Sequence, residues 1–164
     1  MCEHSISAAA ITERMKQEMY QPLDQLFSDV DTYLRNNTVC TEATDIFNDF
    51  LRLKWEYESL RNYELKLVFP SILKMFGAKN PDSNQISIAD LQTLTKRKEV
   101  LICSMASEIE QEAERLSLPV DHPLFRLCSG IEQLLPPIRQ EWNGMMDKWR
   151  QTCACFRSFE TGNQ

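Results

Sequence analysis

Apolar residues recur every three or four positions along most of this 164-residue chain, and this spacing constrains the fold more than any other feature. Residues three or four apart share one face of an α-helix, whereas a half-buried strand needs alternation at every second position. Four stretches carry the helical spacing: 5–36, 44–77, 87–118 and 121–157. We therefore expect an all-α fold, an up-down-up-down four-helix bundle with short connections. Members of the expected core in the second and third stretches include Phe50, Leu51, Leu60, Ile72, Leu91, Leu94, Leu101 and Ile102.

Prolines interrupt three of these stretches and predict bent helices. Proline lacks a backbone N–H and clashes with the carbonyl four residues earlier, so an internal proline kinks or ends a helix. Pro22 predicts either a kink or a new helix start in the first stretch, and Pro70 predicts a bend or break in the second. Pro136 and Pro137 predict a kink or a split in the fourth.

Length and composition fit one domain over 1–164, with a core over about 5–157 and a frayed tail at 158–164. The net charge of −6 disfavours nucleic acid, because phosphate binding needs clustered Lys and Arg. No apolar run approaches the ~20 residues of a membrane-spanning helix. The N-terminus lacks the basic and apolar regions of a secretion signal, so we expect a cytoplasmic protein with reduced cysteines.

The segment at 63–70 carries a family resemblance. Its sequence, Tyr-Glu-Leu-Lys-Leu-Val-Phe-Pro, resembles the end of the second helix in hemerythrin-like (HHE) domains. In that family a histidine and, four residues later, a glutamate precede an apolar Phe-Pro step. Glu64, on the apolar face of its stretch, matches the carboxylate ligand, and Leu60 stands where the histidine belongs. The resemblance implies a four-helix fold around a diiron centre.

The histidines that such a centre requires are missing. Neutral imidazole suits iron, and a hemerythrin-type centre takes most of its ligands from histidine. This chain has only His4 and His122, and neither lies in the second or third stretch. We therefore expect a degenerate hemerythrin-like domain without a metal or other cofactor.

Carboxylates offer an alternative metal site. Glu64, Glu99 and Glu141 could together hold iron in an atypical site, because a cation would offset the cost of burying several negative charges. Without a Glu-x-x-His motif, surface or salt-bridged glutamates are the favoured interpretation.

Two further groups have both structural and functional interpretations. Trp142, Met145, Met146 and Trp149 form a stripe that fits bundle core, or a binding surface if that end of the bundle is open. Cys153 and Cys155 point about 200° apart on a helix, which argues against chelation but leaves a redox-active thiol open.

The sequence carries none of the common catalytic motifs. It contains no G-x-S-x-G, P-loop or dinucleotide fingerprint, and its four glycines cannot build a phosphate cradle. His122 is expected at a helix start, with Asp121 as a possible cap. We predict a non-enzymatic module that acts through protein interaction or small-ligand sensing, with self-association through the fourth helix as one possible mode. The alternatives are a carboxylate-based iron-binding protein and a thiol redox sensor.

Overall fold

The structure is a computed structural model that describes the backbone of residues 3–37, 43–77 and 88–161, and the side chains of 8–37, 45–74 and 89–151. The described chain is helical outside its turns and contains no strand, which confirms the all-α prediction. Each of its helices is too short or too polar to reach across a lipid bilayer.

The helical elements of the described residues form four helical runs, of which two join several consecutive elements and two are single helices. The first run joins α1 (Glu3–Arg14), the π-helix η1 (Met15–Tyr20) and α2 (Gln21–Asn36). The second run joins α3 (Ala43–Tyr63), the π-helix η2 (Glu64–Val68) and α4 (Phe69–Gly77). The single helices are α5 (Ile88–Arg115) and α6 (Pro123–Thr161).

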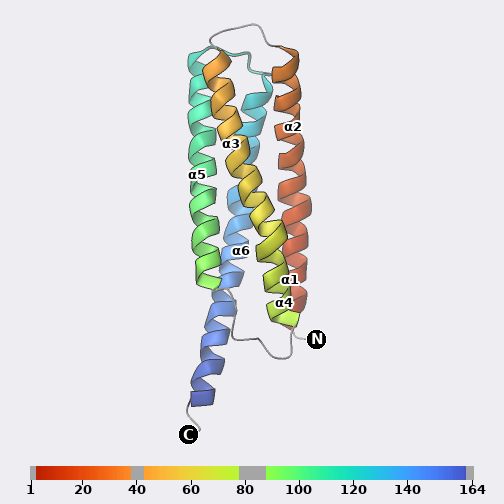
Figure 1. Cartoon of the computed structure of the whole chain (residues 1–164), viewed down its shortest axis with the longest axis vertical. Helices are drawn as coiled ribbons and strands as arrows, with labels where there is room; N and C mark the ends of the chain where they lie inside the picture. The colour runs from red at the N-terminus through yellow and green to blue at the C-terminus, as the bar shows by residue number, and fades with distance from the viewer. Residues whose placement is uncertain (1–2, 38–42, 78–87, 162–164) are drawn as a thin grey trace.

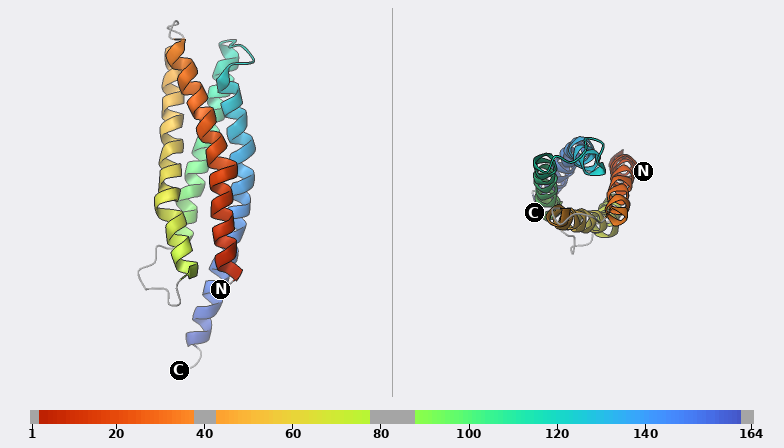
Figure 2. Two further views of the ribbon diagram at one scale, coloured as in Figure 1. Left: turned by 90° about the vertical axis from the view of Figure 1, so that its right-hand side faces the viewer. Right: turned by 90° about the horizontal axis from the view of Figure 1, so that it is seen from above.

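The helices lie side by side along the long axis of the molecule (Figure 1). α5 packs against both α3 and α6, α2 packs against α6, and α1 packs against α4. The end-on view in Figure 2 shows the helices arranged around a common centre.

One apolar core fills that centre and draws on every helical run. Phe27 of α2 stacks on Tyr57 of α3 with ring centroids 4.4 Å apart. The buried side chains of the core include Met15, Met19, Leu23, Phe27, Phe50, Leu53, Tyr57, Leu60, Ile72, Leu91, Ile102, Leu127, Ile131, Leu135, Trp142 and Trp149. The spacing predicted most of these positions, but Leu51, Leu94 and Leu101 are exposed.

A π-helical turn precedes both Pro22 and Pro70. Each turn ends with a backbone hydrogen bond that spans five residues, one more than in an α-helix. Because proline cannot donate and crowds the carbonyl four residues back, a wider turn before it keeps the run continuous. The expected interruptions are therefore π-helical turns, not breaks. The two hydrogen bonds are Gln21 N–H to Lys16 O and Phe69 N–H to Glu64 O.

α6 passes through Pro136 and Pro137 as one helix, so of the two expected alternatives, a kink and a split, the split does not occur. Glu132 and Gln133, four residues before these prolines, are both exposed. Their carbonyls can turn toward water, which reduces the cost of losing two helical hydrogen bonds. The helix continues to Thr161, into the segment expected to be frayed.

Two helical glycines on α6 give a matched test of this packing. A Cβ at Gly144 would meet no atom within 4 Å, whereas one at Gly130 would lie 2.4 Å from Leu26 Cδ1. Alanine favours a helix interior over glycine by ~1 kcal/mol, so Gly144→Ala is expected to raise the free energy of unfolding by about that amount. Gly130→Ala must displace Leu26 and is expected to gain less or to destabilise. Urea denaturation measures both, and equal stabilisation would contradict the close packing of α2 against α6.

Candidate functional site

A buried ion pair crosses the centre of this apolar core. Glu64 is 0 % exposed and Arg139 is 1 % exposed. Charged side chains are almost never buried this completely unless they are paired. The region around this pair is therefore the first candidate for a functional site.

Three helical runs bring the members of this cluster together. Tyr20 is the last residue of η1, Glu64 is the first residue of η2, and Arg139 lies on α6. Glu64 follows the buried Leu60 by four positions, and Arg139 follows the buried Leu135 by four positions. Both therefore lie on the inward stripe of their helix.

The three side chains form a closed hydrogen-bonded triangle. Arg139 donates from Nη1 to Glu64 Oε1 and from Nη2 to Glu64 Oε2, the latter at 2.7 Å. Tyr20 donates its hydroxyl hydrogen to Glu64 Oε2, and its hydroxyl oxygen accepts from Arg139 Nη2 at 3.2 Å. Both carboxylate oxygens are thus bound by the forked guanidinium, which is the strong geometry for this pair.

The protonation states of the triangle follow from its surroundings. Burial and then the charge of Glu64 raise the pKa of Tyr20 well above its ordinary value, so its hydroxyl stays a neutral donor. Burial disfavours the charge on Arg139, but Glu64 and Tyr20 outweigh this effect and raise the pKa of Arg139. The cluster is a fixed ion pair with one neutral phenol.

A second polar chain links this triangle to the surface. The hydroxyl of Tyr57 donates to Asp24 Oδ1 at 2.8 Å and lies 3.2 Å from the backbone oxygen of Tyr20. Asp24 Oδ2 in turn pairs with Arg61 Nη2 at 2.8 Å. Burial, followed by the hydrogen bond to Asp24, raises the pKa of Tyr57.

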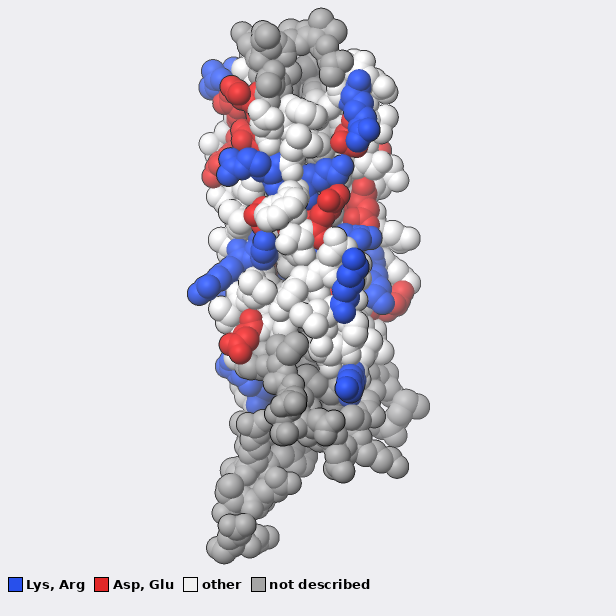
Figure 3. Space-filling model, viewed as in Figure 1, with Lys and Arg blue, Asp and Glu red and all other residues white. Residues whose placement is uncertain are grey.

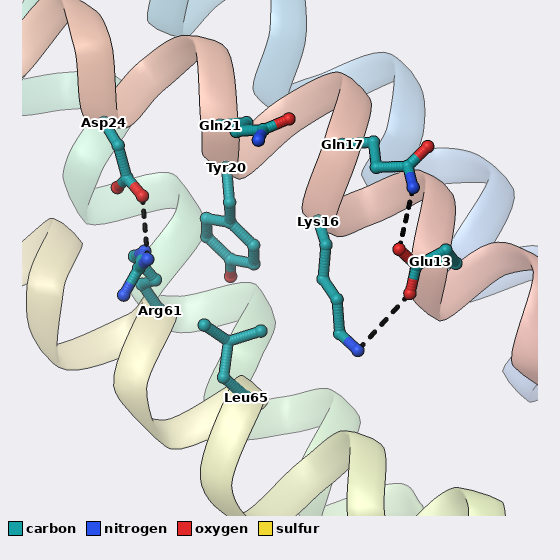
Figure 4. A pocket seen from close by; sticks show the side chains of 8 residues that line it. All are labelled: Glu13, Lys16, Gln17, Tyr20, Gln21, Asp24, Arg61 and Leu65. Carbon is teal, nitrogen blue, oxygen red and sulfur yellow. Dashed lines mark hydrogen bonds and ion pairs between the residues drawn. The ribbon is translucent and has the colours of Figure 1, made fainter.

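An open cleft of about 450 Å³ lies at the outer side of Tyr20, between the first and second helical runs (Figure 4). Tyr20 is nearly inaccessible yet contributes to both the cleft and the buried triangle. The cleft is lined by Glu13, Lys16, Gln17, Tyr20, Gln21, Asp24, Arg61 and Leu65.

The structure does not bring the three alternative metal ligands together. Glu64 binds Arg139, whereas Glu141 is exposed and pairs with Arg14 at 2.7 Å. Glu99 of α5 is half-buried, and burial raises its pKa against the opposing charge of Arg139. Within the described residues, no group of three or more His, Cys, Asp or Glu is placed to hold a metal ion.

The aromatic and methionine stripe of α6 faces the core. Trp142 and Met146 are fully buried, Trp149 is 1 % exposed and Met145 is partly buried. Trp142 meets Phe69 edge-on, with ring centroids 5.4 Å apart. The core interpretation therefore accounts for these residues, which form no open surface patch.

The described thiols are protonated at neutral pH. Burial raises the pKa of Cys128 to about 12 and also raises the pKa of Cys103. Cys153 and Cys155, the candidate redox pair, lie outside the described side chains.

His122 caps the start of α6 itself. Its Nδ1 accepts from the backbone N–H of Leu124 at 3.2 Å, and its ring meets Tyr33 edge-on at 4.5 Å between centroids. Asp121, expected as the cap, is exposed. Burial lowers the pKa of His122.

Breaking the buried pair is expected to destabilise the protein strongly. Glu64→Gln leaves the Arg139 charge buried without its counter-ion, which costs ~3–5 kcal/mol of unfolding free energy. The apolar double variant Glu64→Leu with Arg139→Met removes both charges and should lose less than Glu64→Leu or Arg139→Met alone. Urea denaturation of the full cycle measures this coupling.

The exposed pair Arg14–Glu141 is the matched control for that cycle. Removing either of these residues should change the unfolding free energy by no more than ~1 kcal/mol. Additive losses at Glu64 and Arg139 would show that the two side chains are not coupled.

Protonation of His122 is expected to destabilise the fold. Because burial lowers its pKa below the ordinary 6.5, the unfolded chain binds this proton more readily than the folded chain. Its contribution is fully present above about pH 6.5 and is lost as the pH falls through the lower folded-state pKa. His122→Asn, which keeps a capping acceptor, should flatten the decline. Urea denaturation over a pH series measures how steeply the unfolding free energy falls with pH. An unaltered slope in His122→Asn would show that His122 does not cause this decline.

No protein-family model, no curated protein and no solved structure matches this chain.

Proposed function

We propose that this chain is a non-catalytic, cytoplasmic module that senses a small ligand in the cleft beside Tyr20. In this proposal the scaffold is an up-down-up-down four-helix bundle, resembling a hemerythrin-like domain without a diiron centre. The observation that carries the proposal is the double placement of Tyr20. Its outer side contributes to the cleft, and its hydroxyl hydrogen-bonds Glu64 and Arg139 in the core.

This placement gives a bound ligand a physical route to the core. The cleft joins the first helical run, which carries Tyr20, to the second, which carries Arg61 and Leu65. Tyr20 is tied in turn to Arg139 on α6. A ligand that bridges the cleft would stabilise the junction of three helical runs, and it favours the conformation to which it binds best.

The non-catalytic part of the proposal is supported by what the candidate catalytic groups do. Glu64 is held by both nitrogens of the Arg139 fork, and His122 caps a helix. The thiols of Cys103 and Cys128 have raised pKa values, which disfavours the nucleophilic thiolate.

Protein interaction is a second candidate function, favoured by one exposed aromatic residue. Trp55 on α3 is 64 % exposed, and Leu51, one helical turn earlier, is 40 % exposed. Lys98 Nζ lies 5.5 Å from the centre of the Trp55 ring. Tryptophan is enriched among the residues that dominate binding energy at protein interfaces. Basic and acidic side chains alternate with uncharged surface on the face shown in Figure 3.

Thermal unfolding tests the sensing proposal. A dialysable small-molecule fraction of a cell extract is expected to raise the melting temperature of the wild-type protein by several degrees, because a ligand at 100 times its Kd adds ~2.7 kcal/mol. Arg61→Gln, on the wall of the cleft, should lose this shift. Arg52→Gln, exposed and earlier on α3, should keep it.

Two results would contradict the sensing proposal. One is a melting temperature that no fraction changes, and the other is an equal shift in Arg61→Gln. Trp55→Ala separates the second candidate, because it should leave the ligand shift intact and weaken any self-association seen by sedimentation.

A further inference from the structure

We propose that the ligand of this cleft is a short, flexible dicarboxylate, an assignment that rests on the proposed sensing function and gives it a chemical class. One carboxylate would bind Arg61 and the other Lys16, with the carbon chain lying over Tyr20 and Leu65.

The two carboxylates and the two cations of the cleft differ in how far their hydrogen-bonding capacity is used. The acidic oxygens are engaged: Glu13 receives Gln17 at 2.8 Å and Lys16 at 3.5 Å. Asp24 receives Tyr57 and Arg61, each at 2.8 Å. A ligand that enters the cleft therefore meets two carboxylates that already have donors.

The donors are only partly engaged. Arg61 Nε is buried and has no hydrogen-bond partner among the described residues, although Nη2 of the same guanidinium holds Asp24. Lys16 Nζ has three N–H groups. It forms an ion pair with Glu13 across an N–O distance of 3.5 Å, which is long for a hydrogen-bonded pair. The Arg61 side chain is 33 % exposed, so a ligand carboxylate can approach its guanidinium from the cleft, although Nε itself is buried.

The order of residues across the cleft suggests two anionic groups rather than one. Arg61 and Lys16 lie on opposite sides of Tyr20 and Leu65 (Figure 4). In this view the counter-ion Glu13 lies beyond Lys16, whereas Asp24 lies above Arg61. A ligand over the middle of the cleft would thus have a cation nearest to each of its ends.

The middle of the cleft suits an uncharged linker. Leu65 offers an apolar side chain, and the Tyr20 hydroxyl is turned inward to Glu64. Carbon atoms placed there lose no hydrogen bond, whereas a charged group would be desolvated without a partner. These three features together describe a dicarboxylate with a short methylene chain.

Titration calorimetry of the full chain with glutarate and adipate tests the assignment. Binding is expected for the dicarboxylates, and at least tenfold weaker binding for butyrate, which has one carboxylate. Cadaverine, a diamine with the chain length of glutarate, should not bind. Lys16→Gln and Arg61→Gln should each weaken glutarate binding by about tenfold or more, because a hydrogen bond to a charged group is lost.

Arg52→Gln is the matched control and should bind glutarate as the wild type does. Lys16 is partly exposed, so Lys16→Gln remains informative even if the loss of the Arg61–Asp24 pair unfolds Arg61→Gln. Unchanged affinity in Lys16→Gln would overturn the two-cation assignment.

The failure of this inference can be told from the failure of the sensing function. If an extract fraction shifts the melting temperature through Arg61 but neither dicarboxylate binds, the dicarboxylate assignment is overturned and sensing stands. Tighter binding of cadaverine than of glutarate would overturn the argument from unmet donors. If neither the extract nor a dicarboxylate acts on the cleft, both proposals are overturned.

Discussion

The rest of this structure depends on the desolvation of one carboxylate and one guanidinium. Removing either ion from water costs several kcal/mol, and only good geometry with additional hydrogen bonds repays that cost. Glu64 meets the requirement with a forked contact and the hydroxyl of Tyr20, and Arg139 meets it with both Nη atoms, while its buried Nε has no partner among the described residues. Because the three residues come from three helical runs, a shift of one run along another would separate them. The pair therefore fixes the relative register of runs that apolar packing alone holds less specifically.

The two prolines and the polar cluster occupy the same level of the fold. Pro22 and Pro70 each follow a π-helical turn, and those turns contain Tyr20 and Glu64. An extra residue in a turn changes which side chains face inward, and such turns are frequent at functional sites. Proline chemistry, the inward placement of Tyr20 and Glu64, and the cleft outside Tyr20 thus coincide at one point where the two helical runs meet.

The periodicity of the sequence was enough to predict the all-α fold and the inward face that carries Glu64. It could not predict the partner of Glu64, because arginine is usually exposed. Only the position of Arg139, four residues after Leu135 and three before Trp142, marks it as inward-facing. Local rules left a kink and a split open at Pro136, where α6 continues as one helix, and they failed at Leu94 and Leu101, which share the helical spacing but lie on the surface. Contacts between distant segments decided these cases, and spacing within one segment does not encode them.

The same distant contacts explain why a surface cleft matters for the core. Tyr57 touches both the backbone oxygen of Tyr20 and the carboxylate of Asp24, and Asp24 holds Arg61 at the wall of the cleft. A ligand that draws Arg61 toward itself competes with Asp24, and any change at Asp24 reaches Tyr57 and then the residue that anchors the buried triangle. Such a chain of hydrogen bonds couples two sites only if its members have two arrangements. The Arg61 guanidinium supplies the candidate for that change, since its Nε is unpartnered within the described residues while its Nη2 is engaged.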